Sequence, residues 1–350
     1  MIIDSNVRHG WTSDSELRPF LSSEAYELFA ASGGSSQLAQ WPGFGIPSSR
    51  RSSADYAAVA HDLLERLDGY RAILTYDRFN LAALRDGELA AEVARAMNDW
   101  TVAEWLDRDS RVLGSIIVAT QRPDLAAVEI ARLAQVPRMG QVILGGNGIG
   151  RALGHSVFHP IYRAAAEAGL PVAIHAGSAG GANPPSVAGG GIARYMEQHA
   201  LAAQAAATQI ASLIANGVFE LLPGLRVVVL GAGVAWLPAL VWRMDTDFKG
   251  VRREVPWLRQ APSYYVWRHM FFDVHPLESS EPDPHLTAVL HSLESSLGLL
   301  FGSGYPAWDT EDVATVERVM PAEWHDQILS GNARTLYPSE KVDIGDALTA

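Results

Sequence analysis

The run Leu170-Pro171-Val172-Ala173-Ile174-His175-Ala176-Gly177 is apolar until its end, where a single histidine precedes a small residue and a glycine. A strand that is buried on both faces of a parallel sheet reads as such a continuous apolar run. In an α/β barrel, the strands carry their chemistry at the carboxyl end, where the following loop opens. The run therefore predicts a buried parallel strand that delivers His175 to the mouth of a barrel.

Further short apolar runs are spaced along the chain, with Ala-rich stretches of helical periodicity between them. The predicted strands cover residues 1–4, 71–76, 112–120, 140–145, 172–176, 226–231, 270–274 and 299–303. Strands that alternate with helices over a chain of 350 residues are typical of a (β/α)8 TIM barrel in the α/β class. An open doubly wound sheet is the alternative, because it shows the same alternation.

Two stretches lack any regular pattern. Residues 10–54 are rich in Ser, Gly and Pro, and residues 178–191 are similar. Long loops of this kind in compact domains are usually functional or disordered. We expect one barrel domain over residues 1–337, in which 10–54 is an irregular N-terminal insertion that covers the barrel mouth. Residues 338–350 are expected to be a C-terminal tail.

Composition narrows the class of partner. The formal net charge of -12 argues against nucleic acid and anionic membrane surfaces, which require a basic footprint, and favours a small-molecule substrate. The absence of cysteine excludes thiol chemistry, and Lys249 and Lys341 are the only lysines, so a Schiff-base mechanism has almost no candidates. The chain shows no apolar run of about 18 residues and no signal-peptide pattern, which predicts a cytoplasmic protein.

Candidate site residues follow the predicted strands. His275 comes directly after the strand 270–274, and a site role and a structural role are equally compatible with that position. The stretch 227–233 begins like a dinucleotide-binding turn, but Trp236 stands where the third glycine is needed, so nucleotide binding is disfavoured. The candidate substrate-binding residues are Asn6, His9, Trp236 and Tyr305.

The last predicted strand and its loop indicate a family. The stretch 299–309, Leu-Leu-Phe-Gly-Ser-Gly-Tyr-Pro-Ala-Trp-Asp, closely resembles the motif F-x-S-D-Y-P-H-W-D. This motif is typical of the amidohydrolase-related group that contains aminocarboxymuconate-semialdehyde decarboxylase and γ-resorcylate decarboxylase. Residues 3–8 look like the opening I-D-x-D-V-H of the same family, and residues 158–175, 233–238 and 331–334 resemble further family segments. The resemblance runs from residue 1 to about residue 337.

The resemblance implies a (β/α)8 barrel that holds one divalent metal, usually zinc or manganese. The ligand positions of the family fall on Asn6, Arg8, His175 and Gly304, and only His175 keeps a ligand type. An amide is a weak ligand, a guanidinium has no available lone pair, and glycine has no side chain. After strand six, where the family commonly has an acidic residue, this chain has Gly231. We therefore expect no metal cofactor, with the charge of Arg8 in place of the metal.

Three interpretations follow. In the first, the protein is a metal-independent lyase, hydrolase or cyclase that acts on a small aromatic or unsaturated carboxylic acid. Arg8 then anchors a carboxylate or carbonyl, His175 is the general acid or base, and His275 is a second catalytic candidate. In the second, it is an inactive homologue that binds a ligand or an active partner. In the third, it is a metal-dependent hydrolase or decarboxylase in which His175 still holds zinc with non-standard ligands such as His9 or His275. The resemblance also suggests a homodimer or higher homo-oligomer.

Overall fold

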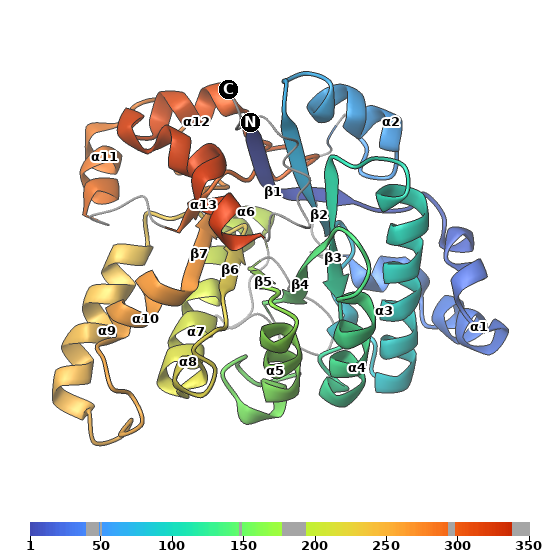
Figure 1. The fold of residues 1–350 in the computed structure, drawn as a ribbon, viewed down its shortest axis with the longest axis horizontal. Helices are drawn as coiled ribbons and strands as arrows, with labels where there is room; N and C mark the ends of the chain where they lie inside the picture. The colour runs from blue at the N-terminus through green and yellow to red at the C-terminus, as the bar shows by residue number, and fades with distance from the viewer. Residues whose placement is uncertain (40–48, 50, 147–148, 177–193, 293–297, 338–350) are drawn as a thin grey trace.

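The computed structural model describes residues 1–39, 49, 51–146, 149–176, 194–292 and 298–337. Its eight strands are all parallel and pair in chain order from β1 to β8, with helices on the outside (Figure 1). The strands are β1 (Ile2–His9), β2 (Tyr70–Tyr76), β3 (Val112–Ile117), β4 (Met139–Gly145), β5 (Val172–His175), β6 (Val227–Leu230), β7 (Met270–Asp273) and β8 (Leu299–Leu300). The predicted (β/α)8 barrel is confirmed.

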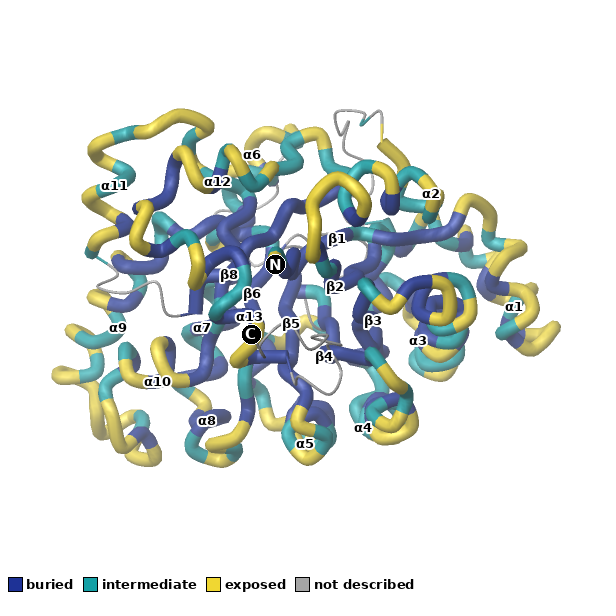
Figure 2. The backbone as a smooth tube through the Cα atoms, turned by 45° about the horizontal axis from the view of Figure 1, so that its top comes forward, coloured by how far each residue is buried: buried dark blue, intermediate teal, exposed yellow. Residues whose placement is uncertain are grey.

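The helices that follow the strands form the outer layer. The longer helices are α1 (Ser23–Ala31), α3 (Gly87–Thr101), α4 (Pro123–Leu133), α5 (His159–Glu167), α7 (Ala202–Ala215), α9 (Leu237–Val251), α10 (Pro262–His269), α11 (Pro284–His291) and α12 (Val313–Val319). The shorter helices include α2 (Tyr56–Val59), η4 (Ala60–Leu64), η6 (Val102–Leu106), α6 (Tyr195–Ala200), α8 (Val218–Leu221) and α13 (Asn332–Leu336). Figure 2 shows buried strands inside helices that turn an exposed face outward. Among the described residues, none of the helices combines the length and apolar character that a bilayer crossing requires.

The barrel closes between its first and last strands. The backbone nitrogen and the hydroxyl of Ser5 both donate to the carbonyl of Phe301 at 2.8 Å. Further along, the backbone nitrogen of Arg8 donates to the carbonyl of Tyr305 at 2.8 Å. These bonds satisfy backbone groups that would otherwise be buried without partners, and they bring the ends of β1 and β8 together at the mouth.

β1 is longer than predicted, because it continues through polar residues to His9. Apart from Arg8, the polar side chains of β1 are buried and hydrogen-bonded: Asp4 accepts from the hydroxyl of Tyr70 at 2.6 Å and from the backbone nitrogen of Ser303 at 2.9 Å. Pairing with β2 is irregular between Asp4 and Val7. These polar residues interrupt the apolar pattern from which a strand is predicted, so the sequence did not show where β1 ends.

The described part of the 10–54 insertion contains a regular helix, which was not predicted. Ser22 caps α1 by accepting a hydrogen bond from the backbone nitrogen of Ala25, and α1 lies on the flank of the barrel beside α3 (Figure 1). Ser49 lines the cavity at the mouth. The predictions for residues 40–48, 178–191 and 338–350 lie outside the described residues.

Candidate active site at the barrel mouth

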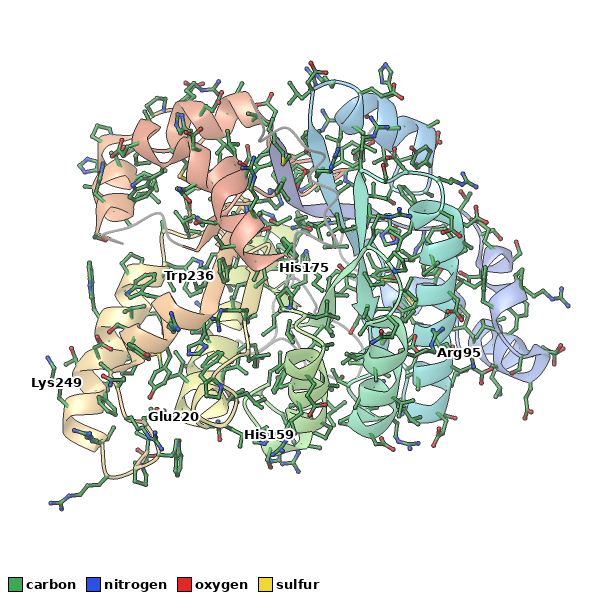
Figure 3. All side chains as sticks on the ribbon, viewed as in Figure 1. Arg95, His159, His175, Glu220, Trp236 and Lys249 are labelled. Carbon is green, nitrogen blue, oxygen red and sulfur yellow. The ribbon has the colours of Figure 1, made fainter. Side chains whose placement is uncertain are left out.

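A cavity of about 170 Å³ opens at the carboxyl ends of the strands. Its polar lining includes Arg8 from β1, Asp77 after β2, His175 from β5, and His275 and Asp309 from the loops after β7 and β8. Figure 3 places His175 near the middle of the barrel. The carboxyl ends of parallel strands meet at one end of a barrel, which is why residues so distant in sequence share one cavity.

Arg8 supplies a cation that no described group neutralises directly. Its guanidinium makes no hydrogen bond and no ion pair with any residue that the structure describes, and Nε is buried without a partner. Burial lowers the pKa of Arg8, while the charges of Asp309, Tyr195 and Asp77 oppose that change. An arginine stays protonated in proteins even so. The mouth therefore presents a permanent positive charge with free donors.

His175 and His275 are neutral at pH 7. Burial, followed by the positive charge of Arg8, holds the pKa of His175 well below its usual range. Burial also lowers the pKa of His275 to about 4, although the Asp309 carboxylate raises it. A neutral imidazole carries one donor and one acceptor nitrogen, so each ring can pass a proton without adding a second cation beside Arg8.

Two glycines leave room for these rings. Gly231 and Gly304 have φ values of +70° and +65°, a conformation that L side chains rarely adopt. A Cβ atom at Gly231 would lie 2.8 Å from Cε1 of His175, and one at Gly304 would collide with the ring of His275. The resemblance placed acidic residues at both positions. Histidine rings from neighbouring strands now occupy that space.

Asp309 and His199 complete the cavity, and neither was among the predicted site residues. Oδ2 of Asp309 lies 3.0 Å from Nε2 of His199 and 3.9 Å from Nε2 of His275. Burial raises the pKa of Asp309, but His199, His275 and Arg8 together outweigh it and bring that pKa to about 2. Asp309 is thus a carboxylate that faces both histidines. Its place at the end of the strand-eight motif was the one available signal, whereas His199 in α6 belongs to no motif.

α6 and the loop after β8 form an aromatic wall of the cavity. Nε1 of Trp308 donates to the hydroxyl of Tyr195 at 3.0 Å. The ring of His199 lies 5.5 Å from that of Tyr195 and 5.8 Å from that of Trp308 between centroids. All three residues line the cavity. The wall offers flat surfaces against which a planar ring can pack.

Asn6 lies beneath the cavity and does not line it. Its amide nitrogen donates to Oδ2 of Asp273 at 2.9 Å, and its amide oxygen accepts from the hydroxyl of Thr75 at 3.0 Å. Oδ1 of Asp273 accepts from the backbone nitrogen of Gly231 at 2.8 Å, and burial raises the pKa of Asp273 to about 8. Asn6 therefore ties β1, β2 and β7 together inside the barrel. No sequence pattern singled out Asp273.

The other three predicted substrate contacts also lie away from this cavity. His9 points outward, where its ring nitrogens contact the carbonyl of Thr75 at 2.5 Å and the hydroxyl of Thr101 at 2.9 Å. Neighbouring side chains on a strand point to opposite faces, so His9 cannot share the mouth with Arg8. Trp236 donates to the carbonyl of Ala232 at 2.8 Å and lies to one side of His175 in Figure 3.

Tyr305 is buried and faces another cavity, where its hydroxyl donates to Asp62 at 3.1 Å. Of the seven predicted site residues, Arg8, His175 and His275 are the three that the structure brings together at the mouth. The pairing of His175 with His9 in a zinc site is not supported, because His9 lies on the outer face of β1. The catalytic roles of the three mouth residues stay predictions.

Comparisons with known proteins identify the family of the chain and proteins that share its fold. A family model described as amidohydrolase matches residues 41–339. γ-Resorcylate decarboxylase from Rhodococcus jostii is 26% identical over 216 residues, which cover 57% of this chain and 60% of that relative, less than two thirds of its length.

Two solved structures share the fold. A dihydroxybenzoic acid decarboxylase from a Polaromonas species has a TM-score of 0.70 at 16% identity, with 100% of this chain and 99% of the other covered. A 5-carboxyvanillate decarboxylase from Novosphingobium aromaticivorans has a TM-score of 0.70 at 18% identity, with 96% and 95% covered. The first holds manganese and the inhibitor 2-nitroresorcinol, and the second holds manganese and 4-hydroxy-3-methoxy-5-nitrobenzoic acid.

The bound manganese corrects the prediction that the protein has no metal cofactor. That prediction rested on the substituted ligand positions alone, and it is contradicted by the metal in decarboxylases of the same fold. The residues present do not fit such an ion, however. Arg8 brings a positive charge to the mouth, the His275 ring fills the space beside Gly304, and the described residues contain no group of three His, Asp or Glu side chains that could hold a metal.

Proposed function

Because the chain belongs to the amidohydrolase family, we propose that it is a carbon–carbon lyase that removes the carboxyl group of a small aromatic carboxylic acid. The observation that carries the proposal is the guanidinium of Arg8, which lies in the mouth cavity without a partner among the described residues. The names of the relatives support the substrate class, since each is a decarboxylase of an aromatic acid.

Arg8 binds the carboxylate of the substrate. The planar guanidinium matches a carboxylate with two parallel hydrogen bonds, and such charge-assisted bonds are about twice as strong as neutral ones. The cavity of about 170 Å³ is smaller than most ligand pockets, which span about 300–1,000 Å³, so it suits a single substituted ring. The ring packs against the aromatic wall formed by Tyr195, His199 and Trp308.

The reaction consumes one proton. The ring carbon that bears the carboxylate gains a proton, the bond to the carboxylate carbon breaks, and its electron pair returns to the ring as carbon dioxide leaves. We assign the proton transfer to His175, with His275 as the second candidate. The neutral imidazole takes up a proton from water at one nitrogen and gives the proton on its other nitrogen to the ring carbon, so the imidazole is neutral before and after the step. Asp309 is a positioning residue, since its carboxylate lies 3.9 Å from Nε2 of His275 and stabilises that ring whenever it becomes protonated.

The test is turnover of a panel of hydroxybenzoic acids, measured as carbon dioxide release and substrate loss, with and without added manganese. We expect Arg8→Gln to lower kcat/KM by about 10- to 100-fold, the worth of a charge-assisted hydrogen bond. His175→Asn is expected to lower kcat by about 10²- to 10⁴-fold, the usual contribution of general acid–base catalysis. The exposed His291→Asn is the matched control and should change neither value.

A ligand-binding protein without turnover is the second candidate. It is favoured by the lack of a metal-holding group among the described residues, since the relatives with solved structures contain manganese. Thermal shifts with the same panel separate the two candidates. Aromatic acids that stabilise the protein, lose that effect in Arg8→Gln and are never turned over would favour the binding protein and contradict the lyase.

A further inference from the structure

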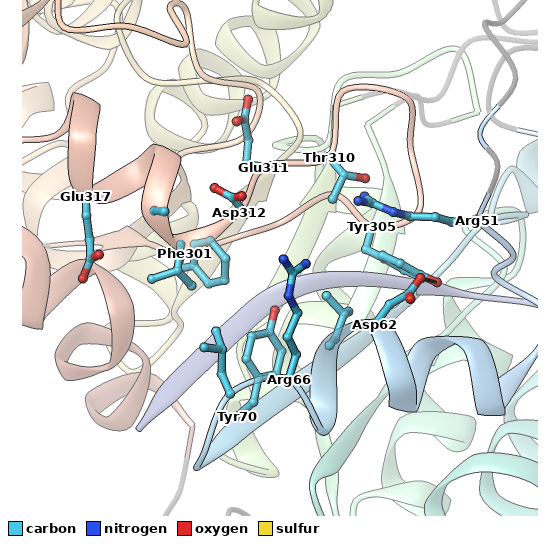
Figure 4. A pocket seen from close by; sticks show the side chains of 14 residues that line it. Arg51, Asp62, Arg66, Tyr70, Phe301, Tyr305, Thr310, Glu311, Asp312 and Glu317 are labelled. Atoms are coloured by element: carbon cyan, nitrogen blue, oxygen red, sulfur yellow. Dashed lines mark hydrogen bonds between the residues drawn. The ribbon is translucent and has the colours of Figure 1, made fainter.

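A second cavity, of about 310 Å³, lies between η4 and the start of α12, outside the barrel mouth (Figure 4). It is larger than the cavity that contains Arg8 and takes no part in the proposed reaction. Its aromatic lining consists of Tyr70, Phe301 and Tyr305, all buried, and Leu63 and Val313 add aliphatic surface. A cavity of this size with an apolar lining is large enough for a small organic ligand.

Two cations stand on one side of this cavity. Arg66 extends its guanidinium into the cavity in Figure 4 and makes no hydrogen bond or ion pair with any described residue. The guanidinium of Arg51 lies over the ring of Tyr305, 5.8 Å from its centroid. Asp62 on the same side accepts the hydroxyl of Tyr305, and the charge of Arg51 helps to lower the pKa of Asp62, although the described residues show no ion pair between the two. The donors of Arg51 and Arg66 are therefore available to an anionic group.

Carboxylates from α12 stand on the other side. Asp312 caps that helix by accepting from the backbone nitrogen of Thr315 at 2.7 Å, whereas Glu317 makes no hydrogen bond with the described part of the chain. Figure 4 shows Glu317 across the cavity from Arg51 and Arg66. The opposite charges of the two sides face each other without forming an ion pair among the described residues.

We propose that this second cavity binds a small zwitterion, an α-amino acid with a large apolar side chain. The carboxylate of the ligand pairs with Arg51 and Arg66, its ammonium group pairs with Glu317, and its side chain packs on Phe301. A simple carboxylic acid would meet the carboxylates beside α12, and a simple amine would meet two guanidinium groups. Only a ligand with both charges satisfies the two sides, which makes the cavity selective.

Calorimetric titration of the full chain with L-phenylalanine tests the proposal. Two probes each lack one charge: 3-phenylpropionate has no ammonium group, and 2-phenylethylamine has no carboxylate. We expect L-phenylalanine to bind and each probe to bind at least about tenfold more weakly, the loss of one charge-assisted pair. Arg66→Ala and Glu317→Ala should weaken the binding of L-phenylalanine by a similar factor. Arg95→Ala, on the exposed face of α3, should leave that binding unchanged.

No binding of L-phenylalanine to the wild-type chain up to about 10 mM, a concentration beyond the range of specific recognition, would overturn the proposal. Equal binding of 3-phenylpropionate, or binding that Arg66→Ala leaves unchanged, would overturn it as well. Thermal unfolding of each variant shows whether it is folded. Arg8→Gln separates this proposal from the proposed lyase, because it should leave L-phenylalanine binding intact while removing the effects of aromatic acids at the mouth.

Discussion

At two positions of the mouth, glycines replace the acidic residues that the family resemblance implies. Gly231 and Gly304 adopt left-handed conformations, and the rings of His175 and His275 fill the space that side chains there would need. Arg8 then lies beside two neutral rings instead of additional carboxylates. Glycine is thus favoured at both positions for two reasons: the backbone has a positive φ, and the adjacent histidine ring leaves no space for a Cβ atom.

Gly304→Ala should disturb both stability and turnover. The added methyl group collides with the ring of His275, and the left-handed conformation costs a residue with a side chain about 1–2 kcal/mol. Urea unfolding should show at least this loss in the free energy of unfolding, and kcat on any substrate found should fall with it. Gly224→Ala is the matched control, because no atom lies within 4 Å of a Cβ there. Equal stability of the two variants would contradict the geometry.

Among the elements, β1 and α6 decide which side chains reach the substrate. β1 turns Asn6 and Arg8 inward and His9 outward, in line with the alternation of a strand. α6 contributes Tyr195 and His199 to the aromatic wall and contacts the loop after β8 through the hydrogen bond from Trp308. Together with the contact between His199 and Asp309, this exposed hydrogen bond holds α6 against the loop after β8.

Trp308→Phe should weaken substrate binding more than it affects the chemical step. The variant keeps an aromatic ring but loses the donor to the hydroxyl of Tyr195, so α6 is held less firmly over the mouth. A net hydrogen bond of about 0.5–1.5 kcal/mol corresponds to a rise in KM of about 2- to 10-fold, with kcat little changed. Trp242→Phe, an exposed tryptophan on α9, serves as the control. A fall in kcat with constant KM would show that the wall acts on catalysis instead.

Across the molecule as a whole, the barrel encloses a polar layer below the mouth. Asp4 and Asp273 are both buried, and burial raises the pKa of each. Hydrogen bonds from Tyr70, Ser303 and Asn6 satisfy their oxygens and connect β1, β2, β7 and the segment after β8. The closed sheet thus holds carboxyl groups in a setting that favours their neutral form.

The stability of the protein should therefore depend on pH through Asp273. Its pKa is about 8 in the folded chain, against 3.8 for the free side chain, so its contribution is fully present below about pH 4 and is lost as the pH rises through 8. The slope is at most about 1.4 kcal/mol per pH unit.

The difference in the free energy of unfolding between wild type and Asp273→Asn should accordingly shift against the wild type as the pH rises from 5 to 8, because the asparagine cannot ionise. Urea unfolding at several pH values measures this difference. A constant difference over that range would contradict a buried, neutral Asp273. The loss of one hydrogen bond in the variant, from Asn6 or Gly231, shifts all values equally and does not affect the slope.

The sequence predicted the fold more completely than the site. Eight apolar runs predicted strands that alternate with helices, and the family resemblance favoured the barrel over an open sheet. Arg8, His175 and His275 share a cavity because they lie at the ends of strands that converge. Asn6, His9, Trp236 and Tyr305 were also chosen, but they lie elsewhere. Asn6 points inward like Arg8 and lies deeper in the barrel, whereas the side chains of the other three point in other directions. Whether the protein forms a homo-oligomer stays a prediction of the resemblance.

Local sequence patterns were sufficient for the barrel, the family and the substitution of Arg8 and Gly304 at the ligand positions, because burial on both faces and short motifs leave a local signature. Tertiary contacts alone brought Asp309 and His199 to the mouth, held Asp273 neutral and placed a second charged cavity beside α12. Each of these depends on which side chains from distant segments face each other. Distance in space, and the burial that shifts a pKa, arise only when the strands have closed into a barrel.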